Sequence, residues 1–275
     1  MRVFISADME GVSGIVSRPQ TDDYDSEDYG RARSLFEEDV CCAVEAALGA
    51  GAEEVVIADS HGSATNLDPR SFPAQVRLVQ GWPRPLGMMQ GIESGSYAAA
   101  ILLGYHTAIT TMEGNFPHSF SSGQFRAVRF NGEPVSEGQV SAWLAGHFGV
   151  PVVAASGDDA CMAELAAAIP GLSVAVTKYS RGMYSAEQLS REYSHAAIRA
   201  AVVDGINAAP GCQPRRLEGA IELELELHNR YLAQLMSYLP GFDRVAAGTI
   251  ACRAKDICEA TQIVGALVHL QADGV

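Results

Sequence analysis

No stretch of this 275-residue sequence reaches the roughly 18–20 consecutive apolar residues that a membrane-spanning helix requires. The amino-terminal segment MRVFISADMEG also lacks the apolar core of a secretory signal, because its apolar run is short and acidic residues follow at once. These two absences favour a cytoplasmic protein that has no membrane partner.

Basic residues are scarce: 19 lysines and arginines stand against 33 aspartates and glutamates, which gives a net charge of −14. A surface of this charge repels nucleic acid and anionic membranes, so we expect neither as a partner. The six cysteines include no CxxC pair, which favours buried reduced thiols over a disulfide framework or a cysteine metal site. With 48% hydrophobic and 19% charged residues, the composition is that of an ordinary globular protein.

Short apolar runs alternate with segments of helical periodicity along most of the chain. The first strand, helix and strand have the lengths of a βαβ unit, which implies a parallel sheet. We therefore predict an α/β fold with three layers, a mostly parallel or mixed sheet, and a second, smaller α/β portion at the C-terminus. The predicted strands are 3–7, 55–58, 76–80, 98–103, 150–155, 172–177, 221–227 and 243–251. The predicted helices are 33–49, 136–148, 158–168, 185–208, 230–239 and 256–271.

A segment with proline and glycine at 210–214 is typical of a linker. It divides the chain into a domain at 1–209 and a C-terminal α/β portion at 210–275, although the two can form one continuous domain. The alternation IELELEL at 221–227 predicts a strand with one buried and one solvent-facing side.

Three of the predicted strands are followed by residue types that bind metals: Asp8 with Glu10, then His61, then His106. The carboxyl ends of parallel strands meet at one edge of a sheet, so these side chains converge there. Asp8 and Glu10 project to the same side of an extended chain, and two such carboxylates repel unless a cation lies between them. Two imidazoles and two carboxylates suit zinc, with manganese and cobalt as alternatives. The sequence therefore predicts a metal site at the carboxyl ends of the strands, in the domain at 1–209.

Each of these residues also has a plainer interpretation. A single strand-end aspartate is more often a turn former, and a single histidine beside a strand is more often a hydrogen-bonded core residue. Their joint placement is what favours a metal site.

Three further residues stay open on the sequence pattern alone. His118, in a loop with glycine, asparagine and proline, suits proton transfer near a metal but is also compatible with an ordinary loop position. Asp59 either orients a metal-binding histidine or accepts hydrogen bonds from its loop. Glu137 begins a helix, where an acidic side chain is favourable in the first turn, and the pattern alone does not make it a ligand.

Five motifs occur in the order found in the M55 family of D-aminopeptidases, which this chain resembles over nearly its whole length. They are DMEGVSGI at 8–15, DSH at 59–61, LGYH at 103–106, HS at 118–119 and VSEG at 135–138. The strings VAASGDD at 153–159 and AKD at 254–256 extend the resemblance toward the C-terminus.

The resemblance implies a dinuclear zinc aminopeptidase that releases D-residues from the amino end of short peptides. It implies two zinc ions per subunit, held by Asp8, Glu10, His61, His106 and Glu137, with Asp8 bridging them. His118 matches the catalytic histidine of the family, a candidate nucleophile. The resemblance also implies a ring-shaped homodecamer with active sites facing an inner chamber. The loop residues 115–117, NFP, differ from the smaller residues typical of that loop, which bears on substrate preference rather than on the metal site.

For the reaction, we hypothesise that a water molecule activated by the two metals attacks the substrate carbonyl. One metal or a nearby acid holds the free amino group, and His118 donates a proton to the leaving amine or stabilises the oxyanion. We prefer this role to a histidine nucleophile, because an acyl-imidazole is a high-energy intermediate. The alternatives are a dimetal hydrolase for another amide or an L-peptide, a phosphoesterase, and a non-catalytic metal- or peptide-binding protein. The phosphoesterase is weaker because no phosphate cradle or arginine clamp is evident.

Overall fold

The computed structural model describes residues 1–270, so residue 271, the predicted end of the last helix, lies outside the described residues. Its largest element is a seven-stranded sheet in the order β3-β2-β1-β4-β7-β8-β9. Six of the strands run parallel, and β9 pairs antiparallel with β8. The strands are β1 (Arg2–Ala7), β2 (Glu54–Asp59), β3 (Val76–Val79), β4 (Ala99–Tyr105), β7 (Val152–Asp158), β8 (Ser173–Gly182) and β9 (Ser185–Gln188).

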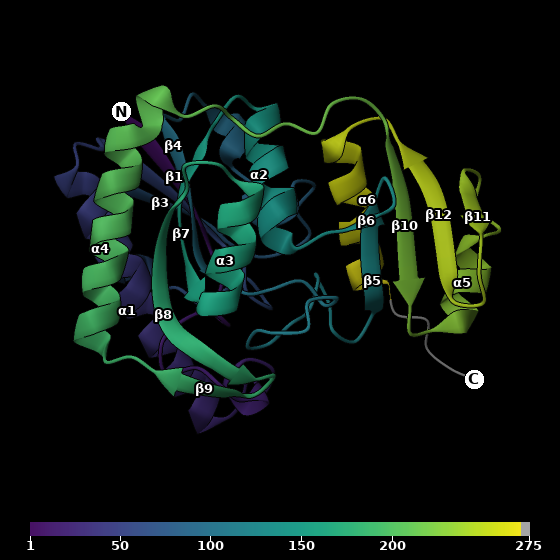
Figure 1. The fold of residues 1–275 in the computed structure, drawn as a ribbon, viewed down its shortest axis with the longest axis horizontal. Helices are drawn as coiled ribbons and strands as arrows, with labels where there is room; N and C mark the ends of the chain where they lie inside the picture. Colours follow the sequence, from purple (N-terminus) through teal and green to yellow (C-terminus); the bar gives the residue numbers. More distant parts are fainter. Residues whose placement is uncertain (271–275) are drawn as a thin grey trace.

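Helices cover both faces of this sheet (Figure 1). On one face lie α1 (Glu27–Gly49) and α4 (Arg191–Ala208), whose Phe36 and Ile198 belong to the same buried core as Ile5 of β1. On the other face lie α2 (Glu137–His147) and α3 (Asp159–Ala168). Because successive strand side chains alternate between faces, β1 contributes to both cores. The predicted three-layer α/β arrangement with a mostly parallel sheet is confirmed.

A second sheet forms the smaller portion of the molecule. Its five antiparallel strands follow the order β11-β12-β10-β5-β6. They are β5 (Phe125–Phe130), β6 (Glu133–Pro134), β10 (Ile221–Leu227), β11 (Phe242–Arg244) and β12 (Thr249–Ala254). Helix α6 (Ile257–His269) lies between the two sheets, and α5 (Arg230–Met236) lies beside the β11 edge (Figure 1).

The alternating strand IELELEL has the predicted two faces. Its leucines are buried, whereas its glutamates are half-buried or exposed. Glu224 accepts a hydrogen bond from Arg129 of β5 at 3.0 Å, so the solvent-facing side carries cross-strand ion pairs.

Local structure differs from the prediction at three places. Helix α1 begins at Glu27 rather than at residue 33, because Ser26 caps it by accepting a hydrogen bond from the Tyr29 amide. Residues 185–188 form β9 and not the start of a helix, which begins at Arg191. The predicted strand 243–251 is in fact two strands, β11 and β12, joined by a turn.

The second sheet takes strands from both sides of residue 210, since β5 and β6 precede it in the chain. The division into 1–209 and 210–275 stays a prediction. Among residues 1–270, no helix has the length and apolar character to cross a membrane.

Candidate metal centre

The site lies where three neighbouring parallel strands end. The order β2-β1-β4 places the residues that follow each strand at one edge of the sheet. Asp8 and Glu10 follow β1, His61 follows β2, and His106 follows β4. All four side chains are buried, with no more than 5% of each residue exposed. Glu137, the first residue of α2, joins them and is buried to the same degree.

Asp8 stands at the centre of this cluster. Its Oδ1 lies 3.3 Å from His61 Nδ1, and that nitrogen lies 3.0 Å from Glu10 Oε2. Its Oδ2 lies 3.4 Å from His106 Nε2, which in turn lies 3.4 Å from Glu137 Oε1. The two carboxylate oxygens of Asp8 therefore face two different groups of potential ligands.

The tautomers of the two histidines are fixed by backbone carbonyls. His61 Nε2 donates a hydrogen bond to Thr21 O at 3.0 Å, and His106 Nδ1 donates to Thr107 O at 3.0 Å. In each neutral ring the other nitrogen then carries only a lone pair. Those bare nitrogens point at carboxylates such as Asp8, an arrangement that is repulsive unless a proton or a cation lies between them.

The residues fit a divalent cation such as zinc. Ligand atoms about 2.0–2.1 Å from a tetrahedral zinc are roughly 3.3–3.4 Å apart, and the contacts around Asp8 span 3.0 to 3.4 Å. Asp8 Oδ2 and His106 Nε2 are buried yet have no hydrogen-bond partner among the described residues. Unpaired buried polar atoms are costly, and a cation between these two would satisfy both.

The electrostatics of the cluster favour positive charge. Burial lowers the pKa values of His61 and His106, but the adjacent carboxylates outweigh it and hold both well above 6.5. For Glu10 and Glu137, burial is outweighed by the nearby imidazoles, so their pKa values are lowered. The pKa of Asp8 is raised by burial and by the negative charge of Glu10. A cation is therefore attracted to the place that protons otherwise occupy.

His118 borders the cluster and is more accessible than its other members. Its Nδ1 donates a hydrogen bond to Phe116 O at 2.9 Å, so Nε2 is the free nitrogen of the neutral ring, and it lies 3.6 Å from Glu137 Oε1. The ring stacks on His106 with centroids 3.8 Å apart. Phe116 has a φ of +56°, and Phe120, whose amide donates to Glu137 Oε1, has a φ of +62°. Strained backbone therefore flanks His118 on both sides and supplies groups that hold the site.

Glycines let the first ligand loop approach the neighbouring strand closely. Gly104 has a φ of +71°, and a Cβ there would stand 2.0 Å from Asp8 O. A Cβ on Gly11 would stand 2.2 Å from Tyr105 O. Backbone hydrogen bonds from Asp8 N to Leu103 O and from Gly11 N to Gly104 O fix this contact. The glycines of the DMEG and LGYH motifs are needed for packing as well as for turning the chain.

Lys178 is a site residue that the sequence did not reveal. It lies in β8, is fully buried, and donates hydrogen bonds to the carbonyl oxygens of Glu10, Val12 and Ile15. Burial lowers the pKa of this lysine to about 8. Nothing in its sequence context distinguishes it from a surface lysine, which is the usual place for this residue type.

Two roles were open for Asp59: orienting a metal-binding histidine, or accepting hydrogen bonds from its loop. The structure shows the second. Its carboxylate accepts hydrogen bonds from Asn66 Nδ2 at 2.9 Å and from the amides of Asn66 and Leu67. Asn66 in turn donates to His61 O. Asp59 therefore anchors the loop that carries His61. Among the described residues, it forms no hydrogen bond with the imidazole ring of His61.

Comparisons with known proteins cover the whole site. The family model for peptidase M55, described as D-aminopeptidase, matches residues 1–266. A D-aminopeptidase of Bacillus subtilis (strain 168) is 27% identical over 271 residues, which is 98% of this chain and 97% of the relative. A solved structure, the Zn-dependent D-aminopeptidase DppA from Bacillus subtilis, a self-compartmentalizing protease, matches with a TM-score of 0.91 at 26% identity, covering 100% of both chains.

Proposed function

This chain belongs to the M55 peptidase family of D-aminopeptidases, and we propose that it is a zinc-dependent enzyme that releases amino-terminal D-residues from short peptides. The family resemblance seen in the five motifs is confirmed. The observation that carries the zinc proposal is the buried pair of bare imidazole nitrogens, His61 Nδ1 and His106 Nε2, which face the two oxygens of Asp8.

We assign the ligands of two zinc ions to this cluster. Asp8, Glu10 and His61 would hold one ion, Asp8, His106 and Glu137 would hold the other, and Asp8 would bridge them. Support comes from the two oxygens of Asp8, which face His61 and His106. Ligand atoms of Asp8, Glu10 and His106 also lie within 4.8 Å of one another, as do those of His106, His118 and Glu137, and the solved relative is zinc-dependent. Bound zinc supplies Lewis-acid polarisation of a carbonyl group and lowers the pKa of water, the chemistry that peptide hydrolysis at neutral pH needs.

His118 is assigned to proton transfer. Its free Nε2 faces the cluster beside Glu137, while the bond from Nδ1 to Phe116 O fixes the ring. A neutral imidazole in this position accepts a proton at Nε2 and delivers it to the leaving amine. A nucleophilic role is less favourable, because it passes through an acyl-imidazole.

The first test is hydrolysis of D-Ala- and L-Ala-p-nitroanilide by the purified protein, with and without a chelator and added Zn²⁺. We expect chelator-sensitive turnover that favours the D-isomer. Turnover of the L-isomer at an equal or higher rate would reject the stereochemical assignment. Bound zinc without turnover of either isomer would keep the metal site and reject the proposed substrate.

The role of His118 is tested by the His118→Ala variant. We expect kcat to fall by about 10²–10⁴ with the zinc content retained. His147→Ala is the matched control, because His147 is exposed at the end of α2 and outside the cluster. An acyl adduct on His118, trapped by rapid quench, would replace the proton-transfer role by a nucleophilic one.

We also propose that the chain assembles into a homo-oligomer, with a homodecamer as the specific expectation. The solved relative is a self-compartmentalizing protease. This chain exposes apolar side chains in and after α5, with Tyr231 48%, Tyr238 68% and Leu239 50% exposed. Light scattering coupled to size exclusion tests the proposal, and a monomer would reject it. A cytoplasmic location stays a prediction.

A further inference from the structure

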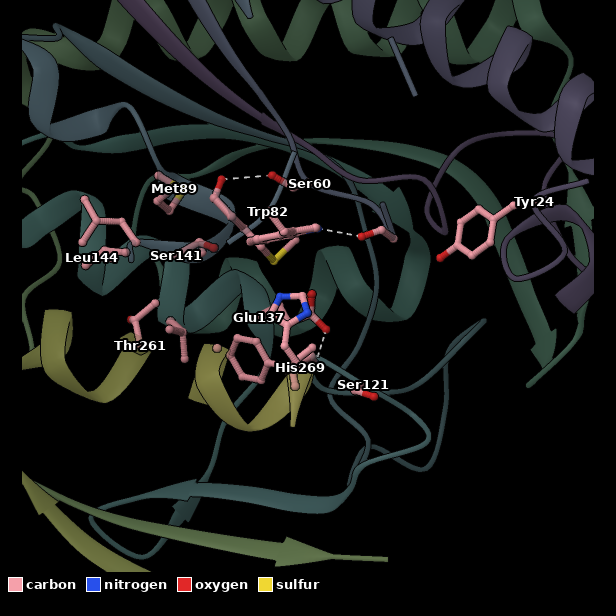
Figure 2. A pocket seen from close by; sticks show the side chains of 18 residues that line it. Tyr24, Ser60, Trp82, Met89, Ser121, Glu137, Ser141, Leu144, Thr261 and His269 are labelled. Atoms are coloured by element: carbon pink, nitrogen blue, oxygen red, sulfur yellow. Dashed lines mark hydrogen bonds between the residues drawn. The ribbon is translucent and has the colours of Figure 1, made fainter. Parts of the chain in front are cut away.

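A cavity of about 310 Å³ has Glu137 of the metal cluster in its wall (Figure 2). Its walls come from three elements far apart in the sequence: the 3₁₀ turn Gly87–Met89, helix α2 and helix α6. Figure 2 shows Met89 and Leu144 at one end, Thr261 and His269 on the wall formed by α6, and Tyr24 at the other end. The cavity therefore lies between the large sheet and α6, the kind of junction where small-molecule sites are common.

The cavity is continuous with the cluster. Glu137 lines it and also contacts His106 within the cluster. Ser60, which precedes His61, lines it as well. Phe120, another lining residue, donates its amide hydrogen bond to Glu137. A molecule whose reacting bond lies at the cluster can therefore extend a side chain into this cavity.

Three hydroxyl groups in the wall, those of Ser60, Ser141 and Thr261, are already used by the protein. Ser60 donates to Met88 O at 3.0 Å, and Thr261 donates to Ile257 O at 2.8 Å. Ser141 shares a hydrogen bond with the hydroxyl of Tyr105 at 3.2 Å. With these three groups satisfied, the part of the wall that they share with methionine, leucine and valine side chains makes little demand for a polar ligand. The remaining polar groups of the lining belong to Tyr24, Ser121, Glu137 and His269.

The side of the cluster where His118 lies is different. A cavity of only about 40 Å³ borders it, lined by Glu10, Arg18, Asp22 and His118 among others. Since His118 is assigned to protonation of the leaving amine, this narrow polar side belongs to the leaving group. The large apolar cavity, which His118 does not line, then belongs to the residue that is released.

We propose that the large cavity binds the side chain of the released residue, and that the preferred amino-terminal residues are large and apolar, of leucine or phenylalanine size. This inference rests on the proposed aminopeptidase function. One water-sized group takes about 30 Å³, so the methyl group of alanine would leave most of the 310 Å³ unfilled. Burial of a leucine or phenylalanine side chain is expected to raise kcat/KM by about 10- to 100-fold over alanine.

The test compares D-alaninamide, D-leucinamide and D-phenylalaninamide by release of ammonia from the zinc-loaded enzyme. The amide leaving group is small, so only the released side chain varies. The variant Gly265→Leu places a side chain in the cavity, because Gly265 lines it and a Cβ there meets nothing within 4 Å. Replacing a helical glycine by leucine also favours the fold of α6. Gly49→Leu is the matched control, since Gly49 is an exposed residue of α1 whose added Cβ also meets nothing.

We expect wild type to prefer the leucine and phenylalanine amides, and Gly265→Leu to lower the ratio of their kcat/KM values to that of D-alaninamide at least tenfold. Gly49→Leu should keep the wild-type ratio. Equal rates for all three amides, or a ratio that Gly265→Leu does not change, would overturn this inference alone. If no amide is hydrolysed in a chelator-sensitive way, the proposed function itself fails.

Discussion

Replacement of Lys178 by methionine tests how the first ligand loop is held. The ammonium group of this fully buried side chain donates to three carbonyl oxygens, those of Glu10, Val12 and Ile15. Methionine has a similar shape but donates nothing. Each carbonyl left without a partner costs about 1–3 kcal/mol. Removal of the buried ammonium group also removes its desolvation penalty, which offsets several kcal/mol of the total cost of the three carbonyl groups.

The expected net loss is about 2–4 kcal/mol in the free energy of unfolding, which for a chain of this size corresponds to roughly 4–12 °C in Tm. Since the freed loop carries Asp8 and Glu10, we also expect the affinity for zinc to fall by about 10- to 100-fold. Thermal unfolding and zinc titration of the Lys178→Met protein measure the two effects.

Lys255→Met is the control for this experiment. The chain has two lysines, and Lys255 is the exposed one, so the same substitution there removes a charge without orphaning a buried carbonyl. Zinc affinity and Tm should stay within error of wild type. If Lys178→Met also keeps both values, the lysine does not hold the loop and the reasoning from its three hydrogen bonds is wrong.

Three further predictions concern the metal-free protein and the two loops. Without metal, His61 and His106 keep protons above pH 6.5 that the unfolded chain releases. The free energy of unfolding of the chelated protein should therefore decline as pH rises through their raised pKa values. Denaturant unfolding across pH 6.5–9 measures this, and a stability that increases with pH would contradict it. In Gly104→Ala, a positive φ and a Cβ 2.0 Å from Asp8 O should displace Asp8 and lower zinc occupancy and kcat/KM at least tenfold; unchanged zinc content would show that the loop adapts. Asp59→Ala should cost about 2–4 kcal/mol in unfolding free energy, because the loop amides lose their acceptor, and a Tm equal to wild type would argue against this anchor.

The site residues that could be predicted from the sequence are those that follow the ends of strands. Asp8, His61 and His106 each directly follow a strand or come within two residues of one, and parallel strands end at a common edge, so their convergence followed from the order of elements alone. The local rule was sufficient because β1 lies between β2 and β4, which makes the three strand ends neighbours.

Other features depend on contacts between distant parts of the chain. Glu137 reaches the cluster because α2 packs against the sheet. The local pattern predicts only that an acidic residue is favourable in the first turn of a helix, and does not predict where that helix packs. Lys178 is buried because carbonyl groups of the loop at 10–15 turn toward β8. Residues 185–188 pair with β8, although their composition is compatible with a helix, because tertiary pairing outweighs local preference.

The pairing of β5 with β10 has a consequence for synthesis of the chain. β5 ends at Phe130, whereas β10 begins at Ile221, about 90 residues later. At roughly 5–20 residues per second, a ribosome needs on the order of 5–18 s to cover that interval. All of the assigned zinc ligands, through Glu137, emerge before the interval is far advanced. The nascent chain can thus gain its metal-binding edge early. Meanwhile β5 has only the two-residue strand β6 beside it, so the edge that later pairs with β10 stays open for chaperones to recognise and for neighbouring chains to capture.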